Sequence, residues 1–196
     1  MQGPETTRDE RRGVARLEAF SDGVYAIAIT LLVLGIEVPD VSEQALGSAL
    51  EDLLPSVLAY FLGFAVIGIF WLNHHRFFAD VERHDTRLLW TNLLHLSFVA
   101  AMPFSTGLIG EFGGTQAGAI IFAANVSAAS LAAYLSEYEA IRSGLLRPKS
   151  ALAGRPLISW SLVTPLVFAL SIPLTFVSVS LAEYSWVLAI LGARDR

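Results

Sequence analysis

Residues 14–36 read VARLEAFSDGVYAIAITLLVLGI, and this stretch is almost wholly apolar after its first third. A helix needs about 20 mostly apolar residues to cross the roughly 30 Å hydrocarbon core of a bilayer. Acidic residues and Pro39 follow the stretch, and proline cannot continue a helix. The sequence therefore predicts a membrane-spanning helix that begins near Val14 and ends near Ile36.

Five more apolar runs predict further membrane spans, at residues 53–73, 88–109, 115–135, 156–172 and 176–191. Residues 40–52 are predicted to form a loop or short helix, residues 74–87 a charged connection, and Pro173 the break before the last span. Composition agrees, because 54% of the residues are hydrophobic and 16% are charged, against about 25% charged in soluble domains. The predicted fold class is all-α, a polytopic membrane protein with six transmembrane helices.

The basic residues predict how the chain is oriented in the membrane. All thirteen Lys and Arg residues lie in four segments, 8–16, 76–87, 142–155 and 194–196. Six spans place these segments on one side of the membrane, and basic loops mark the cytoplasmic side. We therefore expect residues 1–13 to be a cytoplasmic segment, residues 14–193 a six-helix transmembrane domain, and residues 194–196 a cytoplasmic tail.

The first predicted span carries both a charge and an aliphatic stripe. Asp22 lies about two turns inside it, where a carboxylate either faces polar partners in the bundle or lies at the solvated interface. Helical spacing places Ile27, Leu31 and Leu34 on one face, with Thr30 beside that face. On spacing alone, such a stripe is more often a packing or lipid-contact surface than the lining of a pore.

The motif Arg16-x-x-x-Phe20-Ser21-Asp22, followed by GVYAIAITLLVL, resembles the first-helix signature of the transmembrane protein 175 family. This family comprises the endolysosomal potassium channels and their prokaryotic relatives. The stretches FWLNHHR at 70–76, LLWTNLL at 88–94 and PFST at 103–106 also fit, whereas the last three spans are generic. One set of six spans resembles the prokaryotic single-repeat form, which assembles as a homotetramer in the bacterial plasma membrane.

The resemblance implies a potassium-permeable cation channel in which four first helices line a central pore. Ile27, Leu31 and Leu34 would form its hydrophobic constriction, and Thr30 would add weak oxygen contacts beside it. The chain has no Thr-Val-Gly-Tyr-Gly carbonyl filter. Potassium sheds water more readily than sodium, so we expect selectivity to arise from partial dehydration at the apolar ring.

The resemblance also implies a polar network that holds the first helix against the next two spans. Its expected members are Arg16, Phe20, Ser21, Asp22, His74, His75 and Asn92. The expected partners are further copies of the chain, membrane lipid and monovalent cations, with no nucleic acid. No cofactor or metal is expected, and both termini are expected to be cytoplasmic.

Other functions remain open from the sequence. Some relatives conduct protons, so a proton-conducting channel is one alternative. A secondary transporter usually carries several buried charges, whereas the charges in the later spans are few and lie near the span ends. A scaffold without transport also fits the pattern. An intramembrane enzyme would have to use Asp22 and His95, but no nucleophile motif or paired aspartates accompany them, so we expect no enzyme.

The histidines at 74, 75 and 84 could form a metal cluster or provide ordinary polar anchoring at a helix end. Adjacent histidines on a helix point in different directions, so they make a poor pair of ligands. The chain contains no cysteine, which excludes disulfides and thiolate metal sites. Polar anchoring is therefore the favoured interpretation of these histidines.

Overall fold

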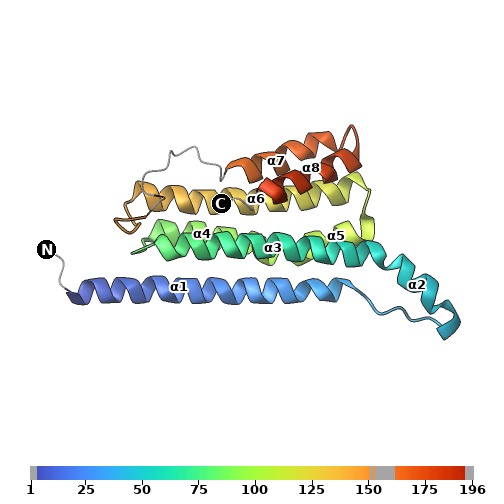
Figure 1. Ribbon diagram of the computed structural model, residues 1–196, viewed down its shortest axis with the longest axis horizontal. Coiled ribbons are helices and arrows are strands. Elements are labelled where there is room, and N and C mark those ends of the chain that lie inside the picture. The colour runs from blue at the N-terminus through green and yellow to red at the C-terminus, as the bar shows by residue number, and fades with distance from the viewer. Residues whose placement is uncertain (1–3, 151, 153–161, 193–196) are drawn as a thin grey trace.

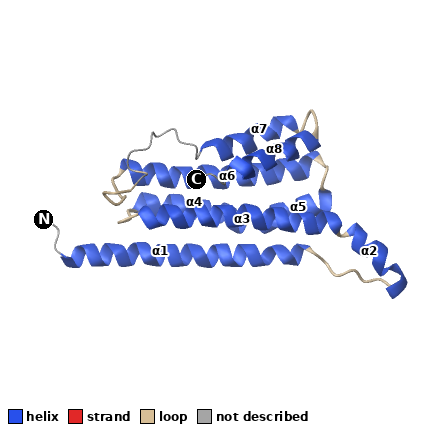
Figure 2. Cartoon of the chain, viewed as in Figure 1, coloured by secondary structure: helices blue, strands red, loops and turns tan. Residues whose placement is uncertain are grey.

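The computed structural model describes residues 4–150, 152 and 162–192, and that part of the chain is built from helices without a β-sheet (Figures 1 and 2). The all-α prediction is confirmed for it. The longer helices are α1 (Pro4–Leu31), α3 (Leu54–Asp80), α4 (Thr86–Ala100) and α6 (Gln116–Arg142). The shorter elements are the 3-10 turns η1 (Leu32–Gly35) and η2 (Glu43–Ala45) and the helices α2 (Leu46–Asp52), α5 (Met102–Phe112), α7 (Val163–Leu174) and α8 (Val179–Gly192).

The helices are stacked in three layers along a common long axis. Figure 1 shows α1 on one side, α3 with α4 and α5 in the middle, and α6 with α7 and α8 on the other side. α1 contacts α3 and α4, while α6 lies between α4 and α7. The pore helix expected from the sequence is therefore an outer layer of the subunit, covered by protein on one face.

Among the described residues, four helical segments are long and apolar enough to cross a membrane: Asp9–Gly35, Leu54–Asp80, Thr86–Phe112 and Gln116–Arg142, each of 27 residues. At 1.5 Å per residue each measures about 40 Å, more than the hydrocarbon core requires. α7 and α8 have 12 and 14 residues, or about 18–21 Å. The structure thus supports four spans by length. The count of six stays a prediction, and residues 156–161, the start of the fifth predicted span, lie outside the described residues.

The connection predicted at residues 74–87 starts later in the structure, so its predicted first residue is wrong. α3 continues for two more turns and ends at Asp80, so His74 and His75 lie within the helix. Tertiary packing explains the longer helix, because Phe77 and Phe78 are buried in an apolar cluster with residues of α1 and α4. Charge alone indicated a loop, but burial of the two phenylalanine side chains stabilises the helix.

The third predicted span is interrupted at Ala101, where α4 ends and α5 begins. Pro103 has no N–H to donate to the preceding turn, so the helix cannot run through this point unbroken. Asn125 of α6 compensates, because its amide group donates to the Phe98 carbonyl (3.2 Å) and to Ser105 Oγ (3.0 Å). A side chain from the next layer thus satisfies a carbonyl beside the break.

The connections at one end of the bundle are joined by backbone hydrogen bonds. α6 ends in a Schellman motif, in which Gly144 takes a positive φ of 62° and the Leu145 N–H donates to the Ala140 carbonyl (2.9 Å). The Leu145 carbonyl then accepts from the Glu82 N–H (2.9 Å), which ties this turn to the α3–α4 connection. Arg87 of α4 also pairs with Glu139 of α6 (3.6 Å).

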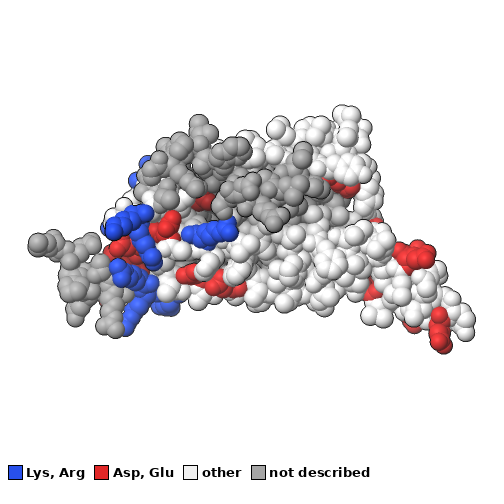
Figure 3. Space-filling view, in the orientation of Figure 1, with Lys and Arg blue, Asp and Glu red and all other residues white. Residues whose placement is uncertain are grey.

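This geometry gathers the described basic segments at one end of the molecule. In the view of Figure 3, Lys and Arg side chains lie over that end, and acidic side chains without basic ones lie at the opposite end near α2. The arrangement agrees with the predicted charge asymmetry among the described residues. Arg155, Arg194 and Arg196 lie outside them.

Gly63 of α3 lies in close contact with Thr106 of α5 and Leu32 of η1. A Cβ at this position would lie 2.7 Å from Thr106 Oγ1 and 3.0 Å from a methyl carbon of Leu32. Thr106 is buried and β-branched on a helix, so its side chain has little freedom to move away. The absence of a side chain at Gly63 therefore permits this three-way contact.

We predict that Gly63→Ala lowers the free energy of unfolding by about 1–3 kcal/mol, the usual cost of overpacking. Gly68→Ala in the same helix is the matched control, because a Cβ there meets no atom within 4 Å. Thermal unfolding of the purified variants in detergent measures both effects. Equal melting temperatures for the two variants would contradict the close packing at Gly63.

Candidate functional site

α1 has one buried face that is continuous along the helix. Its buried residues recur every three or four positions, and the series continues into η1: Val14, Leu17, Ser21, Tyr25, Ala28 and, in η1, Leu32. This spacing keeps them on one side of an α-helix. Two of them are polar, and each begins a chain of hydrogen bonds into the bundle.

The first hydrogen-bonded chain joins α1 to α4 and α3 through buried side chains. His74 Nε2 donates to Asn92 Oδ1 (2.9 Å), since an amide oxygen can only accept. Asn92 Nδ2 donates to Ser21 Oγ (3.1 Å), and Ser21 in turn donates to the Leu17 carbonyl (2.9 Å). Each group in this chain donates to the next one, from His74 to the Leu17 carbonyl. The Asn92 amide and the Ser21 hydroxyl therefore each accept one hydrogen bond and donate another.

The second chain lies one helical turn further along α1. The Ala129 carbonyl of α6 accepts from His95 Nδ1 (2.8 Å), which leaves Nε2 as the acceptor of the Tyr25 hydroxyl (2.5 Å). Tyr25 and His95 are each 2% exposed. α1 is therefore tied through α4 to the third layer of the bundle as well as to the second.

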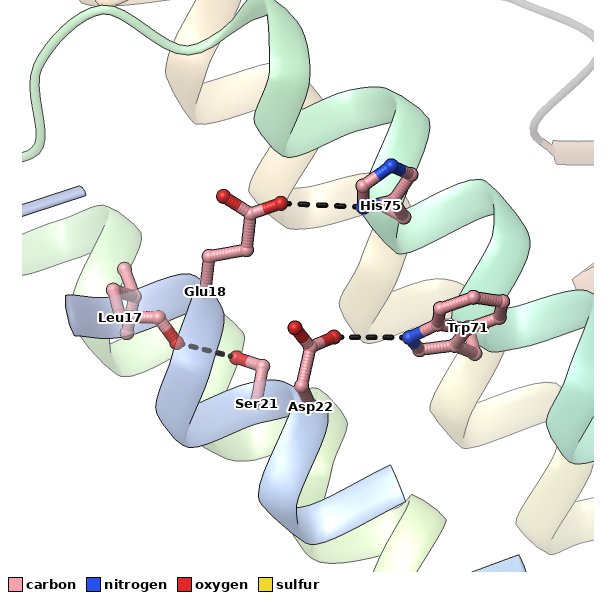
Figure 4. A network of polar contacts seen from close by, with 6 residues as sticks. All are labelled: Leu17, Glu18, Ser21, Asp22, Trp71 and His75. Carbon is pink, nitrogen blue, oxygen red and sulfur yellow. Dashed lines mark hydrogen bonds and ion pairs between the residues drawn. The ribbon is translucent and has the colours of Figure 1, made fainter. Parts of the chain in front are cut away.

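Two more polar contacts lie at the exposed edge between α1 and α3 (Figure 4). Trp71 Nε1 donates to Asp22 Oδ1 (2.9 Å), and Glu18 pairs with His75 Nδ1 (3.2 Å). Glu18 and Asp22 are four residues apart on α1, as are Trp71 and His75 on α3, so the two pairs form consecutive rungs. Figure 4 shows both carboxylates directed at α3.

The structure brings together part of the set expected for the polar network. Ser21, Asn92 and His74 share one chain, while Asp22 and His75 join separate rungs. Arg16 is exposed, Asp22 is bonded to Trp71, and the Phe20 ring is 54% exposed. The assignment of all seven residues to one network stays a prediction.

Four contributors were missed by the sequence reasoning: Glu18, Tyr25, Trp71 and His95. Helical spacing offered a signal for each of them. Tyr25 follows Ser21 by four residues and His95 follows Asn92 by three. Each therefore lies one turn after a predicted member, on the same face of its helix. Sequence spacing does not show which helices pack against each other. The packing of the helices determines the hydrogen-bond partner of each side chain.

The aliphatic stripe lies to the side of the buried face of α1 and is open. Ile27, Leu31 and Leu34 are 61%, 42% and 71% exposed. Leu34 belongs to the 3-10 turn η1, so the stripe ends where the helix tightens. The Thr30 hydroxyl donates to the Ala26 carbonyl (3.0 Å) and the Ile27 carbonyl (2.9 Å), which leaves its oxygen lone pairs for other partners.

The described residues contain no group of three or more His, Cys, Asp or Glu side chains arranged to hold a metal ion. His74 and His75 point to different partners, His74 to Asn92 and His75 to Glu18. The histidines at the end of α3 therefore anchor α3 to α4 and to α1.

We predict that Ser21→Ala lowers the free energy of unfolding by about 1–3 kcal/mol, because it leaves the buried Asn92 amide without an acceptor. Ser97→Ala is the control, since Ser97 is exposed on α4 and bonds only within its own helix. The measurement is thermal unfolding of both variants in detergent. If Ser21→Ala melted at the same temperature as Ser97→Ala, the chain of hydrogen bonds would contribute nothing to stability.

Residues 16–103, which run from the middle of α1 to the start of α5, match the family described as "Endosomal/lysosomal potassium channel TMEM175". A potassium channel of Streptomyces collinus is 51% identical over 98 residues, and a potassium channel of Chamaesiphon minutus is 48% identical over 106 residues. These matches cover 48% and 52% of the two relatives, so the chain spans about half their length. The endosomal/lysosomal proton channel TMEM175 of Gallus gallus is 44% identical over 106 residues, 21% of its length.

Solved structures are similar to this chain beyond the residues that the family match covers. The crystal structure of a lysosomal potassium-selective channel TMEM175 homologue from Chamaesiphon minutus has a TM-score of 0.80 and 33% identity, covering 94% of this chain and 98% of that one. A variant of the potassium channel MtTMEM175, crystallised with a nanobody fusion protein, shares the fold with a TM-score of 0.62 and 21% identity. The chain belongs to the family of the endosomal/lysosomal potassium channel TMEM175.

Proposed function

We propose that this chain is one subunit of a homotetrameric, potassium-permeable cation channel of the bacterial plasma membrane. Four copies of α1 line the pore, and Ile27, Leu31 and Leu34 form its hydrophobic constriction. The observation that carries this proposal is the open aliphatic stripe on a helix whose neighbouring buried face is fixed to the bundle by hydrogen bonds. The potassium-channel names of the bacterial relatives support the choice of ion.

The simplest alternative is that the exposed aliphatic stripe faces membrane lipid and not a pore. Polar groups on the open part of α1 argue against it, because Arg16 and Thr30 are exposed and the Glu18–His75 pair is only partly covered. Ionisable groups in a membrane helix normally face the bundle interior or a water-filled space. A central aqueous pore would provide that space for the exposed polar side chains of α1. The aliphatic side chains of the stripe would then lie at the narrow part of the pore.

An apolar ring can discriminate between ions without coordinating them. Such a ring offers no oxygen to replace lost water, so the ion that holds its water less strongly passes more easily. Potassium is the larger ion and holds its shell less strongly than sodium. The outward lone pairs of Thr30 add weak oxygen contacts beside the ring. The same ring closes the pore by dewetting when it narrows.

The proposal includes six spans, with α7 and α8 as the last two, residues 14–193 as the channel domain, and both termini in the cytoplasm. Gathering of the described basic residues at one end of the bundle supports this orientation. Lipid and monovalent cations are the remaining partners, and no cofactor or enzymatic activity is part of the proposal.

Two alternatives each have an observation in their favour. The hydrogen-bonded histidines next to α1 and the proton-channel name of the Gallus gallus relative favour proton conduction. The interrupted helix at Ala101 is a feature of secondary transporters. Proton flux without potassium would indicate the first alternative, and saturable flux coupled to a second solute would indicate the other.

We predict that Ile27→Asn reduces the preference for potassium over sodium by roughly threefold or more, equivalent to about 0.7 kcal/mol. The amide supplies oxygen contacts at the ring and removes the dehydration penalty that separates the two ions. Potassium and sodium flux into liposomes that contain the purified protein measures the ratio.

The matched control is Leu170→Asn, which places the same side chain on α7, in the layer furthest from α1. Leu170 is 64% exposed and Ile27 is 61% exposed, so the two positions start from similar exposure. Unchanged ion ratios in Ile27→Asn, or an equal change in Leu170→Asn, would remove Ile27 from the selectivity role.

A further inference from the structure

Residues 36–53 join η1 to α3 and form an arm that extends past the bundle. The arm contains η2 and α2, and Figure 1 shows it beyond the end of α1 and further from α6 than the α1 layer. The exposed stripe of α1 belongs to that outer layer. The arm therefore projects on the side of the subunit where the channel proposal places further copies of the chain.

The helix in this arm, α2, has an apolar face that its own subunit leaves uncovered. Leu46 and Leu50 are four residues apart and share one face, whereas Ser48 lies about 160° around the helix from each of them. Leu46 is 41% exposed and Leu50 is 55% exposed. None of the seven residues of α2, all of which the structure describes, is buried. A surface outside the subunit is therefore needed to cover the two leucines.

The arm lies beyond the hydrocarbon core of the membrane. The helical segments on either side of it, Asp9–Gly35 and Leu54–Asp80, each measure about 40 Å, against about 30 Å for the core. The Leu53 N–H donates to the Ala49 carbonyl (3.2 Å), so helical hydrogen bonds continue from α2 towards α3. α2 thus prolongs the second span past the acidic end of the bundle, where acyl chains do not cover its leucines.

The charge of the arm argues against the membrane surface as its cover. Helices that lie on bilayers carry Lys and Arg on the polar face, which anionic headgroups attract. Residues 36–53 contain no Lys, Arg or aromatic residue and five acidic ones: Glu37, Asp40, Glu43, Glu51 and Asp52. Anionic headgroups would repel such a segment, so a protein surface is the better cover for α2.

A second copy of the chain offers an uncharged surface at the same end. Val33 of η1 is 51% exposed, and Val38 at the start of the arm is 91% exposed, so α2 of the same copy does not cover them. A contact between α2 of one copy and these valines of the next joins two different surfaces. Such a heterologous contact closes into a ring around a rotation axis, which is the symmetry of subunits around a pore.

We propose that the apolar face of α2, formed by Leu46 and Leu50, docks against the outer end of α1 in a neighbouring copy of this chain, at Val33 and Val38. The proposal rests on the channel function proposed above, because copies of α1 around one axis bring each arm to its neighbour. It adds a contact outside the membrane to the contacts between the α1 helices, and it assigns a partner to the apolar face of α2.

The test is a photo-crosslink that reports what touches α2. The amino acid p-benzoylphenylalanine, which on illumination joins to C–H bonds that touch it, replaces Leu50 in the full chain in lipid nanodiscs. We expect covalent dimers, and with longer illumination trimers and tetramers, because a ring contact links each copy to two neighbours. Mass spectrometry of the digested product should locate the joined residues at 33–38 of the other copy.

The matched control places the same amino acid at Ser48. Ser48 is equally part of α2 and its hydroxyl donates to the Ala45 carbonyl of η2, but it lies on the opposite face. We expect the protein–protein product to be lost in this variant. If the Leu50 variant does not purify as the wild type does, the same replacement of Leu46 serves the test, because it lies on the same face one turn earlier.

Three results would overturn the proposal: covalent adducts with lipid in place of protein, equal products from the Leu50 and Ser48 positions, or no protein product from the Leu50 position. Native mass spectrometry of the same samples separates this failure from failure of the channel proposal. Tetramers that do not crosslink through Leu50 would remove the contact of the arm and leave the homotetramer intact. Single subunits would remove both.

Discussion

The attachment of α1 to the bundle by buried hydrogen bonds is the constraint on which the rest of the structure depends. Ser21 and Tyr25 lie one turn apart on the same face, where the Ser21 hydroxyl accepts from Asn92 and the Tyr25 hydroxyl donates to His95, both on α4. Satisfaction matters here because an unpaired polar group costs more in a low-dielectric interior than in water. The two chains therefore fix both the rotation of α1 about its axis and its height along the bundle.

Fixing the rotation of α1 decides what the helix presents outward. With Ser21 and Tyr25 turned to α4, Ile27, Leu31 and Leu34 cannot be buried within the same subunit, and they remain exposed. The exposed rungs of Asp22 with Trp71 and Glu18 with His75 add a second attachment, from the middle of α1 to α3. The polar contacts thus hold α1 between Glu18 and Tyr25, and the aliphatic positions that follow border the open surface.

Much of this arrangement could be predicted from the sequence, and the failures have physical reasons. Hydropathy predicted the helices, and spacing placed Ile27, Leu31 and Leu34 on one face. The end of α3 was missed because burial of Phe77 and Phe78 overrides local charge. Which side chains pair between helices also escaped prediction, since Trp71 and His95 acquire partners only from the relative register of α1, α3 and α4.

The most direct test of whether the exposed stripe of α1 faces water or lipid is thiol accessibility, because the chain has no cysteine of its own. Ile27→Cys and Leu170→Cys would each be treated in nanodiscs with a charged, membrane-impermeant thiol reagent, and the extent of modification followed by mass spectrometry. A pore-lining α1 predicts that Ile27→Cys is modified and Leu170→Cys, with similar exposure on α7, is not. If Ile27→Cys reacted no faster than Leu170→Cys, the stripe would face lipid and the account of the pore would be wrong.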